Sequence, residues 1–385
     1  MLKILNFVQD EKFIDGAIEY LSTTPDDAVH DYVIVTSETI EQFQYIKHHP
    51  DKVFQLSPEQ VIEFIEKQHY DTIFLHCLFS CPLNLIAEFP TNIKVCWFGW
   101  GYDMYSEDGS RIITMQLHKP VTKKELEKFE KRHENNHYWK KTKAFVKKLL
   151  SIPSNKEREQ MLYKKAVQRI DYFSGVLSVE YELALQCPFF NAKPVEFHYY
   201  EVSPYRLETI KENNIIIGNS ADPRNNHLDL MEYIEKLDFK GHKVYMPLSY
   251  CGYQEYIEKV KEVYYKKVGE NFQPLESFIN KDDYYDILNS CSVGIFFHER
   301  QQAMGNIKQI LRNGGKVFLS ETSVAYQYLT SIGVSVFSVQ TDLCDAEINK
   351  PLSALEKENN RRLMTPTLEY RINLLIKLYR DIQNE

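Results

Sequence analysis

The chain has 385 residues, more than one hydrophobic core usually supports, so two domains of roughly 150 to 200 residues are expected. Hydrophobic residues make up 43% and charged residues 26%, values that exclude a wholly disordered or fibrous protein. The formal net charge of −8 argues against a general affinity for nucleic acid.

The sequence shows neither an export signal nor a membrane-spanning segment. Its first residues lack a long apolar run, and 18 consecutive apolar residues occur nowhere. The seven cysteines are scattered and form no CxxC pair, which fits a reducing compartment better than a disulfide framework or a zinc site. We therefore expect a cytoplasmic protein without a transmembrane helix.

The first 110 residues alternate short apolar runs with helical patterns. A helix is expected from Ser57 to Gln68, because Ser57-Pro58-Glu59-Gln60 is a helix start signal. The apolar runs are typical of buried parallel strands, at residues 3–7, 32–35, 72–75 and 94–98. This alternation predicts a doubly wound α/β domain.

A basic segment follows, from Lys119 to Ile170. It contains 16 Lys and Arg, six Glu and no Asp, a local charge near +10. Residues 138–150 mix lysines with apolar side chains, as interfacial amphipathic helices do. We expect a helical arm at about 119–170 that binds an anionic membrane surface, with a solvated helical hairpin as the alternative. The lysines assigned to the membrane are Lys140, Lys141, Lys147 and Lys148.

A second domain is expected after a polar linker at residues 201–214. Strand patterns at 172–178 and 195–199 complete the first domain, which then covers residues 1–200. New strands are expected at residues 215–217, 243–246, 293–297 and 316–319. The second α/β domain therefore spans residues 215–364, and residues 365–385 form a final helix.

The loop after the strand at 215–217 is the first candidate site. It opens with Gly218, Asn219 and Ser220 and leads into an amphipathic helix. A glycine and small polar residues directly after a strand let backbone and hydroxyl donors approach a phosphate or a sugar. A capped strand-to-helix turn would give the same pattern.

The loop at residues 298–306 follows another expected strand and precedes a helix. Gly305 permits close backbone approach, and the free N–H groups of the helix N-terminus favour a diphosphate. Arg300 would add a positive charge, while the amides of Gln301 and Gln302 suit hydroxyl or acetamido groups. Because parallel strands bring their carboxyl ends to one edge, both loops should line one site; ordinary loop chemistry is the alternative.

Residues 97–105 end the fourth expected strand and place two glycines among aromatic residues. A tight turn there would expose Trp100 and Tyr105 for stacking on a sugar and would offer Asp103 as a general base. His76 ends the preceding strand and is a second candidate base, with a purely structural histidine as an equal alternative.

Several common motifs are absent. Without an Asp-x-Asp pair, the carboxylates that often hold a divalent metal on a nucleotide sugar are missing. We therefore expect no metal and no other cofactor, and the helix dipole with Arg300 would replace the ion. The sequence also lacks GxxxxGK[ST], GxGxxG and GxSxG, which argues against an NTPase, a dehydrogenase or a serine hydrolase.

Together, the motifs resemble the bacterial TDP-N-acetylfucosamine:lipid II N-acetylfucosaminyltransferases, which act in the synthesis of enterobacterial common antigen. The resemblance covers most of residues 70–110 and 172–340. It rests on four motifs in the same order: Trp100-Gly101-x-Asp103-x-Tyr105, Gly218-Asn219-Ser220-x-Asp222 with Asn225 and His227, Pro247-x-x-Tyr250, and Arg300-Gln301-Gln302-x-x-Gly305.

This resemblance implies a GT-B fold, in which two Rossmann-like doubly wound domains enclose a cleft. It implies that 4-acetamido-4,6-dideoxygalactose (N-acetylfucosamine), or a related deoxy sugar, passes from a dTDP-sugar to a polyprenyl-diphosphate-linked saccharide. The protein would be peripheral, on the cytoplasmic face of the bacterial inner membrane. Loops and resemblance together predict these donor-site residues: Gly218, Asn219, Ser220, Asp222, Asn225, His227, Tyr250, Arg300, Gln301, Gln302, Gly305 and Asn306.

Two other functions stay open. One is a nucleotide-sugar enzyme such as an epimerase, with no lipid acceptor, which the basic arm disfavours. The other is a non-catalytic nucleotide-sugar-binding or scaffold subunit of a polysaccharide assembly complex.

Overall fold

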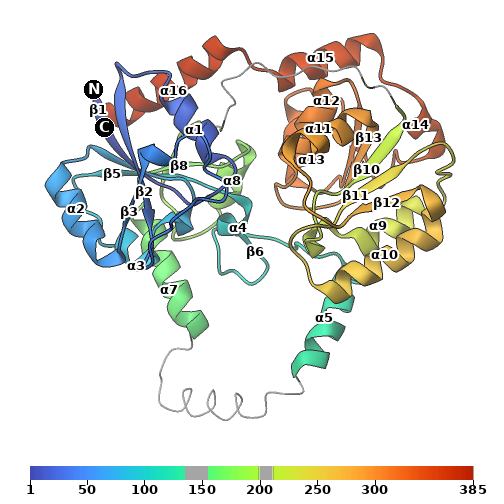
Figure 1. The fold of residues 1–385 in the computed structure, drawn as a ribbon, viewed down its shortest axis with the longest axis horizontal. Coiled ribbons are helices and arrows are strands. Elements are labelled where there is room, and N and C mark those ends of the chain that lie inside the picture. Colours follow the sequence, from blue (N-terminus) through green and yellow to red (C-terminus); the bar gives the residue numbers. More distant parts are fainter. Residues whose placement is uncertain (135–154, 198, 200–209, 211, 385) are drawn as a thin grey trace. The chain divides into compact units, whose positions relative to one another are not determined.

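The computed structural model describes residues 1–134, 155–197, 199, 210 and 212–384, and it divides into two compact units (Figure 1). Unit 1 contains Met1–Met115, Lys143–Tyr205 and Thr367–Glu385. Unit 2 contains Gln116–Thr142 and Arg206–Pro366. The C-terminal segment thus belongs to the same unit as the N-terminus.

Unit 1 is built on seven parallel strands in the order β3-β2-β1-β4-β5-β8-β9. The strands are β1 (Leu2–Phe7), β2 (Ala28–Val35), β3 (Val53–Leu56), β4 (Thr72–Leu75), β5 (Lys94–Phe98), β8 (Tyr172–Ser174) and β9 (Lys193–Pro194). A separate short pair joins β6 (Tyr105–Ser106) and β7 (Ile113–Thr114). The strand order reverses direction between β1 and β4, the position at which doubly wound sheets bind ligands.

Helices cover both faces of this sheet. They are α1 (Ile14–Leu21), α2 (Val61–Gln68), α3 (Leu83–Ile86), α4 (Gly101–Met104), α7 (Asn155–Gln168), α8 (Val179–Ala184) and α16 (Leu368–Gln383). On one face, Ile18 of α1 and Leu378 of α16 join Ile4 of β1 in a single apolar core. Helices α2, α3 and α7 lie on the opposite face (Figure 1), as right-handed crossovers in the other direction require.

Unit 2 repeats the design with six parallel strands in the order β12-β11-β10-β13-β14-β15. The strands are β10 (Asn214–Ile217), β11 (Val244–Pro247), β12 (Phe272–Leu275), β13 (Cys291–Phe296), β14 (Lys316–Leu319) and β15 (Phe337–Ser338). The helices are α5 (Pro120–Glu134), α9 (His227–Ile234), α10 (Gln254–Val268), α11 (Lys281–Ser290), α12 (Met304–Arg312), α13 (Val324–Ser331), α14 (Asp345–Asn349) and α15 (Ala354–Met364).

The central strands of unit 2 are buried on both sides. Ile215 and Ile217 pack with Tyr256 of α10 in the core on the α9 and α10 face. On the other face, Ile310 of α12 packs so closely that a Cβ on Gly294 would lie 2.7 Å from its Cδ1. Such two-sided burial explains the continuous apolar runs by which these strands are predicted.

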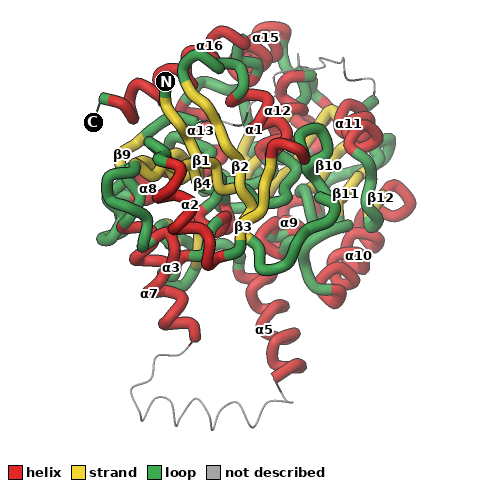
Figure 2. The backbone as a smooth tube through the Cα atoms, turned by 60° about the vertical axis from the view of Figure 1, so that its left-hand side comes forward, coloured by secondary structure: helices red, strands yellow, loops and turns green. Residues whose placement is uncertain are grey.

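Helix α5, at the start of the basic segment, packs on α9 of unit 2 (Figure 2). Its first turn is capped by Asp229 of α9, whose carboxylate accepts the backbone N–H groups of Val121 and Thr122, both at 2.8 Å. Asn226 accepts the N–H of Lys119 at 2.8 Å, and Phe129 enters the core of unit 2. Specific contacts therefore fix the beginning of the basic segment to unit 2.

The prediction of a strand at residues 195–199 is wrong. The strand is β9, Lys193–Pro194; Val195 still donates its backbone N–H to the carbonyl of Phe173 at 3.0 Å, and Phe197 then donates its N–H to Oγ of Ser174 rather than to a backbone carbonyl. The sequence also gave no signal for three outer strands, β3, β12 and β15. Each lies at an edge of its sheet and carries polar residues, so it lacks a continuous apolar run.

None of the helices in the described residues is both long enough and apolar enough to cross a membrane.

Candidate functional site

The loops that follow β10, β11 and β13 gather at the carboxyl edge of the unit 2 sheet. β10 and β13 are neighbours and flank the point at which the strand order reverses. Such an edge is where doubly wound sheets bind nucleotides. The predicted donor-site residues lie in these loops and at the start of α12.

The loop after β10 depends on Gly218, which adopts the left-handed φ of +66°. A Cβ at this position would lie 2.9 Å from Nε2 of His227 and 3.2 Å from Oδ1 of Asn225. The amide of Asn225 donates to the carbonyl oxygens of Ser220 and Asp222, at 3.0 and 3.1 Å. The side chains of Ser220, Asn225 and His227 are buried, so they support the loop from the interior of unit 2.

Two charged residues in this loop form an ion pair. Arg224 donates from Nε to both carboxylate oxygens of Asp222, at 2.8 and 3.0 Å. Burial works to raise the pKa of Asp222, but the hydrogen bonds and charge of Arg224 outweigh it and lower that pKa. Burial also lowers the pKa of His227 to about 4, so its imidazole is neutral near pH 7. Sequence reasoning missed Arg224, although it is the one cation between residues 218 and 227.

Three predicted donor residues from three loops form one hydrogen-bonded chain. Gln302 donates from Nε2 to Oδ1 of Asn219 at 2.9 Å, and Asn219 donates from Nδ2 to the hydroxyl of Tyr250 at 3.3 Å. Gln302 is 6% exposed, and its Oε1 accepts no hydrogen bond from any described residue. Tyr250 is 49% exposed. These three hydrogen-bonded residues thus offer a ligand the buried acceptor Oε1 of Gln302 and the accessible ring of Tyr250.

Helix α12 begins at Met304, and Ala303 between it and Gln302 is its N-cap residue. Gly305 in its first turn is exposed, and a Cβ there would meet no atom within 4 Å. Asn306 donates from Nδ2 to the hydroxyl of Tyr284 at 2.7 Å. Arg300 donates from Nη1 to the carbonyl of Gln301 at 2.9 Å, and its Nη2 lies 3.9 Å from Asp222. Arg300 is therefore directed at the neighbouring loop, and the first turn of α12 is open.

Glu299 is a second charged residue of this edge that the sequence did not predict as part of the site. Its carboxylate accepts hydrogen bonds from Ser320 and Thr322, both at 2.8 Å, and Nζ of Lys119 lies 2.5 Å away. Glu299 is 7% exposed. This cluster joins the loop after β13 to the loop after β14 and to the start of the basic segment.

In unit 1, the structure places Asp103 in the first turn of α4 as a buried cap. Oδ1 accepts the N–H of Trp100 at 2.6 Å, and Oδ2 accepts Leu78 N–H and Trp97 Nε1–H, both at 2.8 Å. Its exposure is 0%. Burial raises the pKa of Asp103 to about 7, against the opposing effect of these three donors. Both carboxylate oxygens are thus occupied by donors of unit 1, so in this conformation Asp103 holds the loops around it; its predicted role as a general base stays a prediction.

His76 is likewise enclosed, at 3% exposure. Nε2 donates to Oδ1 of Asn6 at 3.0 Å, which leaves Nδ1 to accept from the hydroxyl of Tyr199 at 2.8 Å. Burial lowers the pKa of His76 to about 3. Both ring nitrogens are used inside the unit, as expected of a structural histidine.

The two predicted aromatic contacts differ. Trp100 is partly exposed and packs against Phe13, with ring centroids 5.0 Å apart. Tyr105 is 4% exposed and donates its hydroxyl to Glu180 at 2.5 Å, so its ring offers no free face.

The predicted membrane lysines Lys140, Lys141, Lys147 and Lys148 lie outside the described residues. Among the residues that are described, no group of three or more His, Cys, Asp or Glu side chains is arranged to hold a metal ion.

Comparison with known proteins identifies the fold. Residues 196–372 match the model of a family described as 4-alpha-L-fucosyltransferase, glycosyl transferase group 56. A glycosyltransferase from Rickettsia africae ESF-5 is similar over 99% of this chain and 98% of its own, with a TM-score of 0.58 and 14% identity.

Two further structures are similar over 100% of both chains at 10% identity. They are sucrose-phosphate synthase from Thermosynechococcus elongatus, with a TM-score of 0.61, and the Anabaena protein HepE in complex with UDP and glucose, with a TM-score of 0.59. The two doubly wound sheets and these neighbours show that the chain has the GT-B glycosyltransferase fold.

Proposed function

We propose that this protein transfers 4-acetamido-4,6-dideoxygalactose, or a related deoxy sugar, from a dTDP-linked donor to a polyprenyl-diphosphate-linked saccharide in the synthesis of a cell-surface polysaccharide. The match to a fucosyltransferase family supports the donor class, because fucose and the proposed sugar are both 6-deoxyhexoses of the galacto series. The four sequence motifs support the acetamido group and the lipid-linked acceptor.

The observation that carries the donor site is the chain formed by Tyr250, Asn219 and Gln302. A buried carbonyl without a hydrogen-bond donor costs about 1–3 kcal/mol, and Oε1 of Gln302 is such a group among the described residues. An N–H of a thymine base or of an acetamido group would satisfy this oxygen. Tyr250, half exposed at the end of the chain, would pack against the ligand.

The diphosphate is assigned to the first turn of α12. Free N–H groups and the positive end of the helix dipole favour phosphate there, and the exposed Gly305 leaves room for it. Arg224 and Arg300, both held by Asp222, keep positive charge in the adjoining loops. The proposal needs no metal ion for donor binding.

Acceptor binding is assigned to unit 1. There Asp103 holds the backbone of Leu78 and Trp100, which follow β4 and β5, and so positions two loops of the carboxyl edge. His76 positions Tyr199 and Asn6 in the same way.

Calorimetric titration with dTDP, UDP and GDP, first in EDTA and then with magnesium, tests the donor site. We expect metal-independent binding with a preference for dTDP, weakened by Asn219→Ala and by Gln301→Ala. An absence of binding to all three nucleotides would contradict the proposal and favour a scaffold subunit. A nucleotide-binding scaffold would bind dTDP but would not release it from a dTDP-sugar when the lipid-linked acceptor is added.

Attachment to a membrane is tested by flotation with anionic vesicles. Each Lys or Arg near such a surface contributes about 1 kcal/mol, so alanine at Lys140, Lys141, Lys147 and Lys148 should lower the bound fraction strongly. Unchanged flotation of the fourfold variant would indicate a solvated helical hairpin.

A further inference from the structure

Lys119, the residue before α5, forms an ion pair inside unit 2. Its Nζ lies 2.5 Å from Oε1 of Glu299, in the loop between β13 and α12, and 4.4 Å from the centroid of the Phe297 ring. The side chains of Lys119 and Glu299 are 18% and 8% exposed. Asn226 accepts the backbone N–H of Lys119 at 2.8 Å. This lysine therefore belongs to the folded edge of unit 2, and its charge is largely withdrawn from solvent.

The buried carboxylate of Glu299 needs a cation. It accepts hydrogen bonds from the hydroxyl groups of Ser320 and Thr322, both at 2.8 Å, but these donors are neutral. Removing one partner of a buried ion pair leaves the other charge uncompensated, which is strongly unfavourable. Without Lys119, the negative charge of Glu299 would act on Arg300, the next residue in the same loop, and would offset its positive potential.

The other buried carboxylates of this edge have their own partners. Asp222 is paired with Arg224 through hydrogen bonds from Nε at 2.8 and 3.0 Å, whereas Nη2 of Arg300 is 3.9 Å away. Asp229 accepts two backbone N–H groups of α5 at 2.8 Å. Neither carboxylate therefore depends mainly on Arg300 for its charge balance. The positive potential of Arg300 remains in the loop before α12, next to the helix turn to which the diphosphate is assigned.

We propose that Lys119 is a positioning residue of the donor site, which neutralises Glu299 and so preserves the positive potential of the loop at residues 298–306 for the donor diphosphate. This inference rests on the proposed function for the diphosphate and for its place at α12. It gives the first cation of the basic segment a role at the nucleotide, distinct from the membrane role proposed for the lysines at 140–148.

Calorimetric titration with dTDP, and displacement of dTDP by thymidine, which lacks the diphosphate, test this role in the full-length protein. Lys119→Met keeps an apolar side chain against Phe297 but removes the charge. It should weaken dTDP binding at least several-fold and leave thymidine binding nearly unchanged. Lys124→Met is the matched control, because Lys124 is exposed on α5, and it should bind dTDP like the wild type.

Removal of both charges should restore binding. Glu299→Gln can keep its contacts with Ser320 and Thr322, because an amide accepts from one hydroxyl and donates to the other. Lys119→Met combined with Glu299→Gln should therefore bind dTDP nearly as tightly as the wild type. A merely structural role for Lys119 would not give this recovery. Glu299→Gln alone should bind dTDP at least as tightly as the wild type, and it covers the case in which Lys119→Met fails to fold.

Four results would overturn the inference and leave the donor site standing. They are wild-type dTDP affinity in a folded Lys119→Met, an equal loss of thymidine binding in that variant, a double variant that does not recover, and weaker dTDP binding by Glu299→Gln. A wild-type protein that binds no nucleotide would contradict the proposed function itself, and the inference would fall with it. The wild-type titration therefore separates the two failures.

Discussion

Gln302 donates a hydrogen bond from Nε2 to Oδ1 of Asn219 at 2.9 Å, although the two residues are separated by 83 positions. The sheet makes this contact possible, because β10 and β13 are adjacent and parallel and therefore end at the same edge. This hydrogen bond joins the loop after β10 to the loop after β13. A ligand that contacts one of the two residues should therefore also affect the position of the other.

A double-mutant cycle should reveal this coupling in nucleotide affinity. Asn219→Ala and Gln302→Ala should each weaken dTDP binding by about 0.5–1.5 kcal/mol, and the double variant should lose less than the sum, because each substitution already breaks the shared bond. Calorimetric titration measures the affinities. Gln273→Ala on the edge strand β12 serves as the control and should bind dTDP normally. Strict additivity would contradict a shared site.

Replacing each of two glycines of the proposed donor site by alanine should have opposite effects on the unfolding free energy. Gly218→Ala forces a side chain into a left-handed backbone and against His227, so it should lower the unfolding free energy by about 1–3 kcal/mol. Gly305→Ala has open space within a helix and should change stability by less than about 1 kcal/mol, toward a more stable protein.

The same pair tests where the diphosphate binds. A methyl group at position 305 would project from the exposed first turn of α12, so Gly305→Ala should weaken dTDP binding while the protein stays as stable as the wild type. Thermal unfolding and dTDP titration provide the two measurements. Normal affinity in Gly305→Ala would move the diphosphate away from this helix.

The sequence predicts which loops gather at the carboxyl edges, because that follows from buried parallel strands. It does not predict which polar side chains face a ligand. The spacing of Trp100 and Asp103 is compatible with an exposed base, yet Leu78 from another loop donates to that carboxylate and buries it. A partner this distant leaves no local signal.

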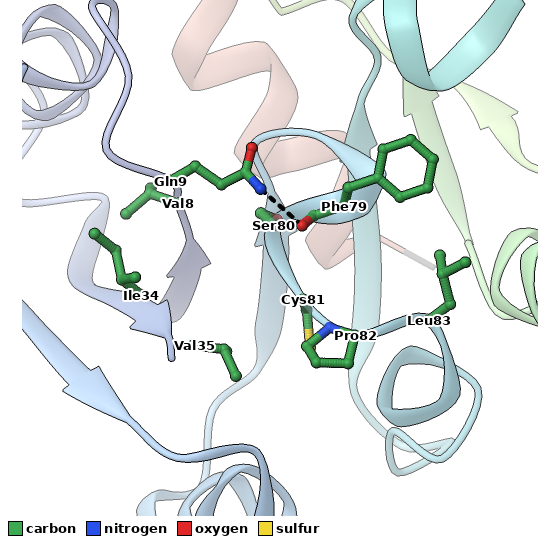
Figure 3. Close-up of a pocket in the computed structure, with 9 residues that line it drawn as sticks. All are labelled: Val8, Gln9, Ile34, Val35, Phe79, Ser80, Cys81, Pro82 and Leu83. Carbon is green, nitrogen blue, oxygen red and sulfur yellow. Dashed lines mark hydrogen bonds between the residues drawn. The ribbon is translucent and has the colours of Figure 1, made fainter. Parts of the chain in front are cut away.

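The basic segment shows the same limit. Its charge is obvious in the sequence, but its attachment to unit 2 depends on Asn226 and Asp229, which lie more than a hundred positions away. The cavity lined by Val8, Ile34 and Leu83 (Figure 3) was also not predicted, since its residues come from the end of β2 and from the loops after β1 and β4 and form no polar motif.

Asp229 should be the main anchor of α5. Asp229→Ala removes a charged acceptor from two backbone N–H groups in the first turn of that helix. We therefore expect the free energy of unfolding to fall by about 2 kcal/mol and the amides of Val121 and Thr122 to exchange faster. Hydrogen exchange followed by mass spectrometry measures both residues in one peptide. Glu232→Ala, an exposed carboxylate on the same helix, is the control. Equal exchange in the two variants would show that α5 is held by its apolar side alone.

Glu180 should make unit 1 less stable as the pH rises. Its carboxyl group is buried, and burial raises its pKa to about 7 despite hydrogen bonds from Tyr105 and Leu177. In the unfolded chain the pKa is near 4.3. The folded state therefore binds more protons between these values, and the unfolding free energy falls as pH rises through that range, by up to about 4 kcal/mol.

Glu180→Gln removes this titration and keeps the shape of the side chain, because the amide can accept from Leu177 and donate to Tyr105. The variant and the wild type should have similar melting temperatures at pH 5, and the variant should be the more stable at pH 8. Glu182→Gln, on the exposed side of α8, should follow the wild type at both values. Burial also raises the pKa of Asp103, so the stability of Glu180→Gln should still fall somewhat as pH rises. Parallel curves for wild type and Glu180→Gln would mean that Glu180 is ionised in the folded protein even at pH 5.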